Sequence, residues 1–441
     1  MQYSQIQVLP PTPIRVLPPA PPGGVTAGID WATADHVACV VDASGQVRAR
    51  FSAAHDRAGI RKLTGGLRAE GASEVAIERG EGVLVDALLA AGLTVVVITS
   101  RQVRNLRSRY GAAGAKDDRF DAFVLADVLR TDRARLRPLV PDTPATLALR
   151  AAVRARRDLV GHRIAACNQL RAHLDASFPA GTRLFAELDS GISLAFLTRF
   201  GSQDAAGALG QGDLAAWLKT LPHRGKAAGP EQLLARLQAA PAGATGAEGA
   251  ARAVVTRALV TTLVTVTAQI RALEAEIAAQ LDAHPDAHVF TSLPRSGTLR
   301  AARLLAEIGD CRSRFPDPES LTGLAGVAPV TRQSGKHSSA GFRWAVNKQL
   351  RDAVCDFAGD SRLASPWAAG IYGAARARGK DHPHAVRITA RAWLYVIWRC
   401  WQDGTAYDPD KHRALQRTLE QQQDPDGGIA DGAGTGTGSE R

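Results

Sequence analysis

The segment Val25-Thr-Ala-Gly-Ile-Asp30-Trp31 is a short apolar run with one carboxylate inside it. Two runs of similar character follow at 36–42 and 46–51, and the turn residues Asp42-Ala-Ser-Gly45 separate them. This order predicts three antiparallel strands connected as a meander. The chain then alternates, with helices expected at 56–70, 83–91, 101–110 and 119–130 and strands at 74–78 and 94–98. The pattern indicates an α/β domain with an RNase H-like sheet.

Four carboxylates fall on three of these expected elements. They are Asp30 within the first strand, Glu78 at the end of the fourth, and Asp118 and Asp121 at the start of the last helix. An Asp inside an apolar strand is costly unless it is ligated or paired. Together the four could hold two Mg²⁺ ions about 3.5–4 Å apart at a phosphodiester. Taken alone, Asp118 and Asp121 are more typical of an acidic first helical turn, which the helix dipole stabilises.

A basic segment lies between Glu78 and the Asp pair. Residues 101–116 carry five basic side chains and no acid. A solvated helix face is one interpretation. The other is a nucleic-acid contact, because the small residues 111–115 would let a phosphate backbone come close. The candidate nucleic-acid-binding residues here are Arg101, Arg104, Arg107, Arg109 and Lys116.

The whole chain is basic, with a net charge of +11 over 441 residues and a pI near 9.8. A polyanion is therefore the expected partner.

No apolar run approaches the ~20 residues that span a bilayer. The Pro-rich residues 1–24 and the polar residues 419–441 are expected to be disordered. Five scattered cysteines without C-x-x-C spacing argue against disulfides and zinc and favour a reducing cytosol.

Two long helices are expected in the middle of the chain, over 146–178 and 251–281. The second carries two seven-residue apolar series, which predict a coiled-coil seam of about three heptads. The pattern fits both an intramolecular hairpin and a dimer zipper. The stretch 222–249, rich in Ala, Gly and Pro, is expected to be a loose insertion. The two series are Leu259, Val266 and Leu273, and Leu263, Ile270 and Ile277.

The last part of the chain contains an uninterrupted positive segment. Residues 320–351 lack any acid, and Ser334 stands before a glycine within them. Basic donors around an uncovered hydroxyl suit an attack on phosphate. Composition alone does not separate this from a phosphate-binding loop, nor Ser334 from Ser296, Ser338 or Ser339. The candidate nucleic-acid-binding residues of this segment are Arg332, Lys336, His337, Arg343 and Lys348.

A second expectation concerns residues 288–298, whose pattern resembles a hairpin leading into a helix over 299–308. Such a unit grips a nucleic-acid backbone through main-chain N–H groups at the helix start. A plain turn before a helix fits the same residues.

Several motifs together resemble one known family, the DEDD-type transposases of insertion sequences, described as bridge-RNA-guided recombinases. The resemblance extends over most of residues 25–412. The motifs are Ala27-Gly-Ile-Asp30, Ala76-Ile-Glu78-Arg79, Gly114-Ala-Lys116-Asp117-Asp118-Arg119-Phe120-Asp121-Ala122, Leu125-Ala-Asp127, and Gly326-Val-Ala-Pro329 with Gln333-Ser334-Gly335-Lys336. Asp117 stands where the family usually has an uncharged residue.

The resemblance implies three domains and a mechanism. A RuvC-like domain (25–140) holds Mg²⁺ or Mn²⁺ on Asp30, Glu78, Asp118 and Asp121, coiled-coil helices follow (145–283), and a mostly helical transposase domain (284–412) supplies Ser334. Ser334 attacks DNA to give a 5′-phosphoserine. A homodimer pairs into a homotetramer in the bacterial cytoplasm, at the nucleoid. A structured guide RNA pairs with double-stranded target and donor DNA, so that base pairing reads sequence.

Two alternatives remain open from the residues. A Mg²⁺-dependent endonuclease of the Holliday-junction type would use the carboxylates to activate water, with Ser334 only binding phosphate. A non-catalytic RNA- or DNA-binding protein is disfavoured, because strand carboxylates without a metal weaken both stability and polyanion binding.

Overall fold

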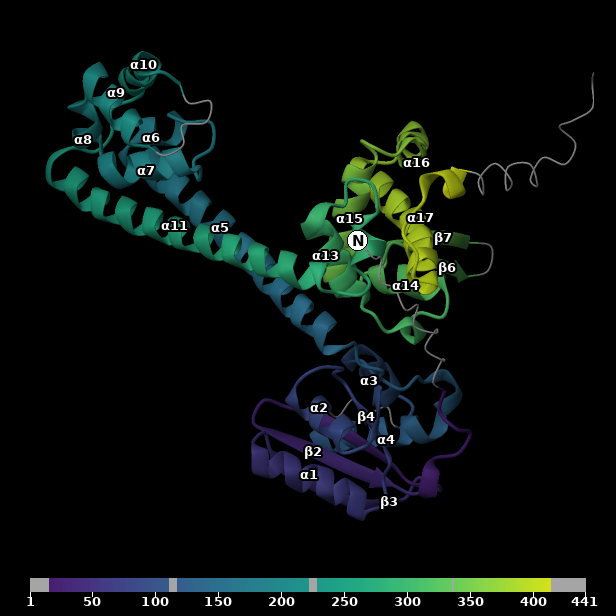
Figure 1. The fold of residues 1–441 in the computed structure, drawn as a ribbon. Coiled ribbons are helices and arrows are strands. Elements are labelled where there is room, and N and C mark those ends of the chain that lie inside the picture. Colours follow the sequence, from purple (N-terminus) through teal and green to yellow (C-terminus); the bar gives the residue numbers. More distant parts are fainter. Residues whose placement is uncertain (1–15, 111–116, 222–227, 335–336, 414–441) are drawn as a thin grey trace, which may run out of the picture. The chain divides into compact units, whose positions relative to one another are not determined.

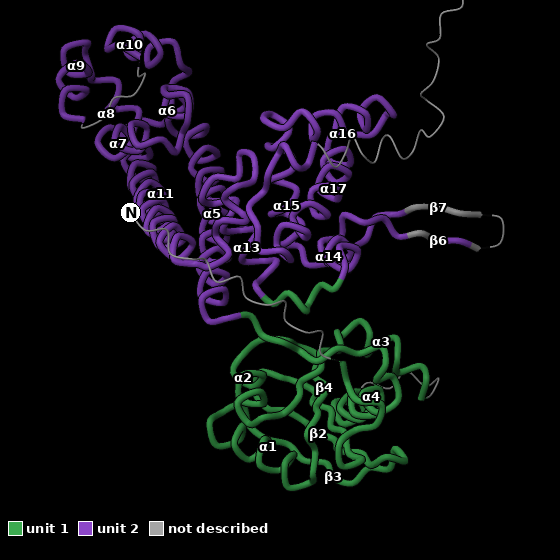
Figure 2. The backbone as a smooth tube through the Cα atoms, turned by 45° about the vertical axis from the view of Figure 1, so that its right-hand side comes forward, with its two compact units in different colours: residues 1–142, 311–316 green, residues 143–310, 317–441 purple. Residues whose placement is uncertain are grey.

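The structure is a computed structural model that describes residues 16–110, 117–221, 228–334 and 337–413. Of residues 331, 332, 334 and 337–340 only the backbone is described. The chain divides into two compact units, and Figure 2 colours them separately. Unit 1 comprises residues 1–142 and 311–316, and unit 2 comprises 143–310 and 317–441. Each unit is described by itself below.

Unit 1 is built on a five-stranded sheet in the order β3-β2-β1-β4-β5. The first three strands pair antiparallel, and β4 and β5 extend the sheet parallel to β1. The predicted meander and the two later strands are confirmed. The strands are β1 (Thr26–Trp31), β2 (Asp35–Val41), β3 (Val47–Ala54), β4 (Glu74–Ile77) and β5 (Thr94–Val97).

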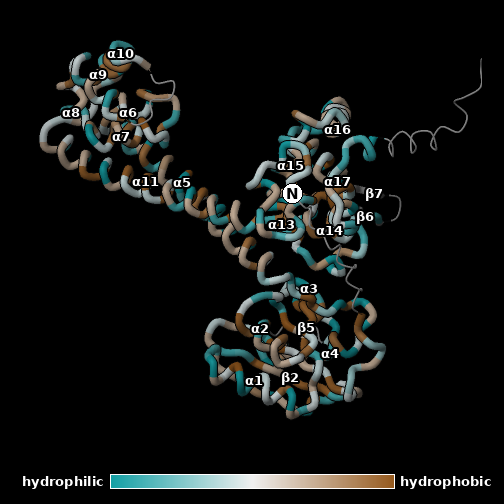
Figure 3. The backbone as a smooth tube through the Cα atoms, viewed as in Figure 1, coloured by the Kyte–Doolittle hydropathy of each residue, from teal (hydrophilic) through white to brown (hydrophobic). Residues whose placement is uncertain are grey.

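Helices cover both faces of this sheet (Figure 1). Side chains alternate between the faces of a strand. Ile29 and Ile77 therefore pack with α1 (Arg57–Ala69) and α2 (Val83–Ala90), whereas Ala76 packs with α3 (Ser100–Arg107) and α4 (Asp118–Thr131). Strand β4 is buried on both faces, as are the first four residues of β1, and Figure 3 colours much of this sheet as hydrophobic. The predicted α/β class of this part is confirmed.

One glycine fixes how closely α4 lies on β1. A Cβ built on Gly28 would come within 2.2 Å of the Ala122 carbonyl oxygen and 2.5 Å of the Ala126 nitrogen. The Thr26 hydroxyl donates a hydrogen bond to the Ala126 carbonyl at 2.9 Å. The helix α4 therefore runs antiparallel to the strand β1. Two residues of the strand rise about 6.6 Å, which is close to the rise of about 6 Å of four helical residues.

The N-terminal segment is ordered from Leu17 onward. Leu17 packs against the core beside α4, the Pro18 carbonyl accepts a hydrogen bond from Arg133, and Pro22–Gly24 form one turn of 3-10 helix. The prediction of a disordered leader was therefore wrong for residues 17–24. Residues 1–15 and the predicted disordered tail at 419–441 lie outside the described residues.

Unit 2 contains a long helical hairpin of α5 (Pro144–Ser177) and α11 (Gly246–Asp282). The Arg156–Glu274 ion pair and the hydrogen bond from His173 to Thr256 show that the helices run antiparallel. The predicted seam therefore forms within one chain. Its series Leu263, Ile270 and Ile277 is buried, and the series Leu259, Val266 and Leu273 is partly buried.

The far end of this hairpin carries a small helical cap. It consists of α6 (Pro179–Arg183), α7 (Gly191–Phe200), α8 (Gln203–Gly207), α9 (Gln211–Thr220) and α10 (Pro230–Ala239). Leu233 of α10 is fully buried in the core that Trp217 and Phe196 also build. The expectation of a loose insertion was therefore wrong for residues 230–239. Residues 222–227 lie outside the described residues.

Helix α11 is long and apolar enough to cross a membrane by length and composition alone. The expectation that no such run exists was wrong. A single helix of this kind is weak evidence for a membrane span, and α11 packs lengthwise on α5 through its buried series.

The rest of unit 2 is a helical bundle with one hairpin. The hairpin pairs β6 (Val330–Ser334) with β7 (His337–Gly341). Residues 287–291 are helical, so the prediction of a hairpin at 288–298 was wrong, and a turn leads into α13. The helices are α12 (Ala287–Thr291), α13 (Gly297–Ile308), α14 (Pro318–Ala325), α15 (Lys348–Ser361), α16 (Pro366–Ala377) and α17 (His382–Asp403).

We expect Gly28→Ala to destabilise unit 1 by about 1–3 kcal/mol, because the added methyl group overlaps backbone that must move. Gly65→Ala is the matched control. Its Cβ would meet nothing within 4 Å on α1, and alanine stabilises a helix interior by about 0.5–1 kcal/mol. Hydrogen exchange of β1 and α4 peptides in the full chain measures both changes. Equal exchange protection in the two variants would contradict the close contact.

Candidate active site

Asp30 and Glu78 lie side by side at one edge of the sheet. Ile29 of β1 pairs with Ile77 of β4 in parallel register, and the two acids follow these residues directly. Both therefore project to the face that α4 covers, opposite to the face of Ile29 and Ile77. Ser100, the first residue of α3, donates its hydroxyl to Glu78 Oε2 at 2.6 Å. The structure thus brings the two predicted strand-end acids next to each other.

Helix α4 carries the other two carboxylates in its first turn. The Thr26 hydroxyl bonds the Ala126 carbonyl, and Gly28 lies against Ala122 and Ala126, so the helix runs antiparallel to β1 and begins toward the Asp30 end of the strand. The two aspartates differ sharply in environment. Asp118 is exposed, whereas Asp121 is only 2% exposed.

Asp117 has a separate role. Its carboxylate accepts a hydrogen bond from the Arg119 backbone N–H at 3.2 Å and caps the start of α4. An N-cap acceptor satisfies one of the free N–H groups at a helix start. The extra acid in this motif is accounted for by helix capping.

Arg107 from α3 reaches into the acids. Its guanidinium donates to both oxygens of Asp121, and only about a fifth of its side chain is exposed. The pKa of Arg107 is raised above its ordinary value by the hydrogen bonds to Asp121, and burial opposes the rise. The charges of Asp121, Glu78 and Asp30 raise this pKa further. Arg107 therefore binds Asp121 directly and lies within electrostatic reach of Glu78 and Asp30.

The donor set suits a hard divalent ion, since carboxylate oxygens are the ligands that Mg²⁺ prefers. The arrangement, however, is not a closed metal cage. Within the described ranges, no three His, Cys, Asp or Glu side chains lie close enough together to hold one ion. Both oxygens of Asp121 are taken by Arg107. A metal ion on Asp121 would therefore compete with a guanidinium.

The other basic candidates of unit 1 differ in exposure and in their partners. Arg101 and Arg104 are exposed on α3. Arg109 lies 3.6 Å from Asp132 and donates to the Thr131 hydroxyl, so it is partly neutralised. Lys116 lies outside the described residues.

The candidate nucleophile stands at the tip of the hairpin in unit 2. Ser334 is the last residue of β6, and its backbone pairs with His337 across the turn. The rival Ser296 is only 2% exposed, and its hydroxyl has no hydrogen-bond partner among the described residues, so it is closed to a DNA phosphate. Ser338 and Ser339 lie on β7, where they pair with Gln333 and Arg332.

The remaining predicted contacts flank this hairpin. The backbone of Arg332 lies in β6 and that of His337 in β7, and Lys336 lies outside the described residues. Arg343 follows β7 and is half-buried, and Lys348 is the exposed first residue of α15. Arg332 and His337 thus stand on the same hairpin as Ser334, whereas Arg343 and Lys348 follow the hairpin in the chain.

Comparison with known proteins places both halves of the chain in one family. A family model described as "Transposase" matches residues 27–179, and a second, "Transposase IS116/IS110/IS902 family", matches residues 287–372. The mini-circle putative transposase for IS117 of Streptomyces coelicolor is 32% identical over 414 residues, which is 90% of this chain and 98% of that protein. The chain belongs to the IS116/IS110/IS902 family of transposases.

A second relative supports the same assignment over nearly the full length. The uncharacterized 42 kDa protein of insertion element IS900 of Mycobacterium paratuberculosis is 30% identical over 395 residues, 87% of this chain and 97% of that protein. The predicted family of insertion-sequence transposases and the predicted enzyme class are confirmed. The acids lie in the first matched region and Ser334 in the second.

Sequence reasoning missed one set of cations of this transposase. Lys380, His384, Arg387 and Arg391 line a pocket at the base of the Ser334 hairpin. The three on α17 follow the spacing i, i+3 and i+7, which places them on one helix face. This spacing was the available signal, although the same helix also carries Trp393, Trp398 and Trp401, and tryptophans are typical of core packing.

Proposed function

We propose that this transposase cuts and rejoins DNA through a covalent phosphoserine on Ser334. The observation that carries the proposal is the position of Ser334 at the tip of the hairpin, while Ser296 is buried. The Ser334 hydroxyl loses its proton and attacks a DNA phosphorus, a P–O bond forms, and the P–O3′ bond breaks to release a 3′-hydroxyl. Attack by another 3′-hydroxyl on the 5′-phosphoserine then restores both the diester and the serine.

Unit 1 is proposed to act as a RuvC-like domain. The sheet order, with three antiparallel strands and two further parallel ones, supports an RNase H-like assignment. Asp30 and Glu78 follow paired residues of neighbouring strands, and both act on the arginine that binds Asp121, which supports a site for Mg²⁺ or Mn²⁺ that Asp118 completes. When bound, a divalent ion supplies positive charge to the phosphodiester oxygens. In this proposal Arg107 holds the acids together until the ion replaces it.

The Ser334 proposal predicts a protein–DNA adduct that survives denaturation. We expect the adduct to disappear in Ser334→Ala, since the hydroxyl oxygen that forms the phosphoester is removed. Ser338→Ala, on the facing strand, is the control and should retain the adduct. The measurement is gel electrophoresis in detergent after reaction with DNA that carries the ends of the element and its flanks. DNA cleavage that persists in Ser334→Ala without an adduct would instead indicate the endonuclease mechanism.

The metal proposal predicts that MgCl₂ compensates for the stability lost when Arg107 is removed. We expect Arg107→Ala to destabilise unit 1 by about 3 kcal/mol, because Asp121 is left buried without its partner. Millimolar MgCl₂ should restore much of this loss, since a bound cation replaces the guanidinium. Hydrogen exchange of α4 peptides reports both effects.

Two variants control this experiment. Arg104→Ala removes an exposed arginine of the same helix and should leave exchange unchanged with or without MgCl₂. Arg107→Ala combined with Asp118→Asn should lose the restoration. Equal restoration with and without Asp118 would exclude that carboxylate as a ligand.

The partners are proposed to be target and donor DNA, a structured guide RNA and further copies of the chain. The net charge of +11 supports nucleic-acid partners. Exposed apolar side chains on α5 and α11 support a homodimer that assembles to a tetramer. They are Leu147, Ile164, Val254, Val255 and Val264.

Purification of the complex tests these partners. We expect light scattering to give dimers or tetramers, and sequencing to recover one structured transcript encoded beside the gene. A monomer that carries only random RNA fragments would contradict both proposals. Val254→Lys with Val264→Lys should shift the complex toward monomers, since charges on an apolar contact oppose association.

A further inference from the structure

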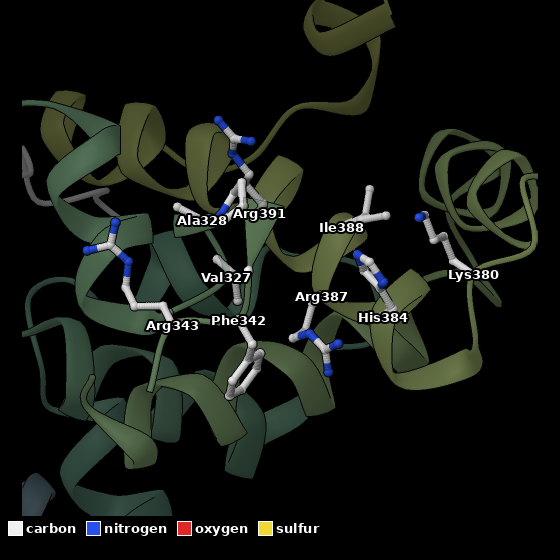
Figure 4. A pocket seen from close by; sticks show the side chains of 12 residues that line it. Val327, Ala328, Phe342, Arg343, Lys380, His384, Arg387, Ile388 and Arg391 are labelled. Carbon is white, nitrogen blue, oxygen red and sulfur yellow. The ribbon is translucent and has the colours of Figure 1, made fainter. Parts of the chain in front are cut away.

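A cationic pocket lies at the base of the Ser334 hairpin, within unit 2. Its volume is about 460 Å³. Val327, Ala328 and Pro329 precede β6, Gly341 ends β7, and Phe342 and Arg343 follow it, so both ends of the hairpin form one wall. Helix α17 and Lys380, two residues before it, form the other wall, from which Lys380, His384, Arg387 and Arg391 reach the pocket (Figure 4).

The described lining carries four permanent cations and one histidine, and none of its twelve residues is acidic. These cations also have no acidic partner among the described residues. Several other arginines of this bundle do: Arg295 and Arg300 bind Asp360, Arg303 binds Asp356, and Arg399 binds Asp403. The pocket thus brings together four cations that are not neutralised in this way.

The local contacts show that this charge is held in place. Arg343 has a buried Nε that meets no hydrogen-bond partner in the part of the chain that the structure describes. A buried donor without a partner is costly, so it does not by itself account for the position of this side chain. Arg387 and Arg351 both lie on the ring of Phe342, with their guanidinium carbons 5.0 Å and 4.4 Å from its centre. Stacking of this kind orients a guanidinium while leaving its edge free to donate.

The two stacked arginines also repel each other. The pKa of Arg351 is lowered from its ordinary value, first by burial and then by the charge of Arg387. An anion between the pocket cations would relieve this repulsion. The nearby acids are already engaged, since Asp381 caps α17 through the His384 N–H and Asp352 binds Arg157.

The shape of the lining specifies the anion further. Val327, Pro329 and Ile388 add an apolar surface beside the guanidinium groups. A sugar-phosphate backbone presents both kinds of surface, whereas a free inorganic anion presents only charge. Val330 and Gly341 are the paired residues at the base of the hairpin, and Ser334 lies four residues further along β6, about 13 Å away. This distance equals about four base-pair steps of duplex DNA.

We propose that this pocket binds the backbone phosphates of the DNA strand, a few nucleotides from the phosphate that Ser334 attacks. Arg343, Arg387 and Arg391 donate to phosphate oxygens, and Val327 and Ile388 contact the sugars. The inference rests on the proposed function for its choice of DNA. The pocket anchors the strand on the rigid helix α17, and the hairpin carries the nucleophile along it.

The test measures non-covalent binding by the full chain. The probe is a labelled duplex DNA of random sequence, titrated at several salt concentrations by fluorescence anisotropy. We expect Arg387→Gln with Arg391→Gln to weaken binding roughly tenfold at physiological salt. The slope of log K against log salt should fall by about 1.8, or about 0.9 for each phosphate that is no longer neutralised. Arg387→Lys with Arg391→Lys should keep most of the slope.

A control pair removes the same charge elsewhere. Arg378→Gln with Arg399→Gln changes an exposed residue after α16 and an Asp403-paired residue of α17, neither in the pocket. Binding should then change less than twofold. Unchanged affinity and slope in the Arg387 and Arg391 double variant, with normal thermal unfolding, would overturn the proposal. So would a loss confined to a hairpin RNA probe.

Failure of the pocket and failure of the serine mechanism remain distinguishable. Ser334→Ala keeps all the pocket cations and should bind the duplex as the unmodified chain does. If the pocket variants weaken binding while no covalent adduct forms in any chain, the DNA pocket stands and the serine mechanism falls. If the adduct forms and the pocket variants bind DNA normally, the pocket proposal alone falls.

Discussion

The contact between Gly28 of β1 and the backbone of α4 is the constraint on which the acidic site depends. Only a residue without a side chain lets the Ala122 carbonyl come this close to the strand. The helix then runs along β1 at the depth where Thr26 bonds Ala126. This packing fixes the position of α4, and with it Asp121, relative to the strand that carries Asp30. A larger residue at position 28 would lift the helix from the strand, even if all four carboxylates are kept.

The same close packing creates an electrostatic problem, which Arg107 resolves. Asp121 is nearly inaccessible to water, and Asp30 and Glu78 add further negative charge beside it. A buried carboxylate without a partner destabilises a fold by several kcal/mol. The Arg107 guanidinium is the partner that Asp121 needs, and it comes from the same chain. The acids can therefore be gathered before any metal arrives, and a residue from the predicted nucleic-acid-binding segment contributes to the stability of the domain.

Much of unit 1 could be predicted from sequence, because its order follows from local patterns. Alternating apolar residues gave the strands, and the strand-borne Asp30 marked the functional edge. The pairing of Arg107 with Asp121 could not be predicted, since fourteen residues separate them and the contact depends on how α3 and α4 pack. Residues 287–291 were misjudged because a short apolar run fits a strand and a helix equally well. Helix α10 was missed because flanking Ala, Gly and Pro hid the buried Leu233.

The hairpin of unit 2 needs support from outside its own two strands. Two paired strands of five residues each are marginally stable when isolated in water. Ser334 lies at their far end, yet a nucleophile must be held in place to react. The support has to come from the base, where Gly341, Phe342 and Arg343 meet α17 around the pocket. The cations that would hold DNA there also flank the residues that anchor the hairpin. Binding of the DNA strand would therefore also fix the direction of the β-strand β6. Specificity need not reside in these side chains, since arginines that bind phosphates read backbone rather than bases.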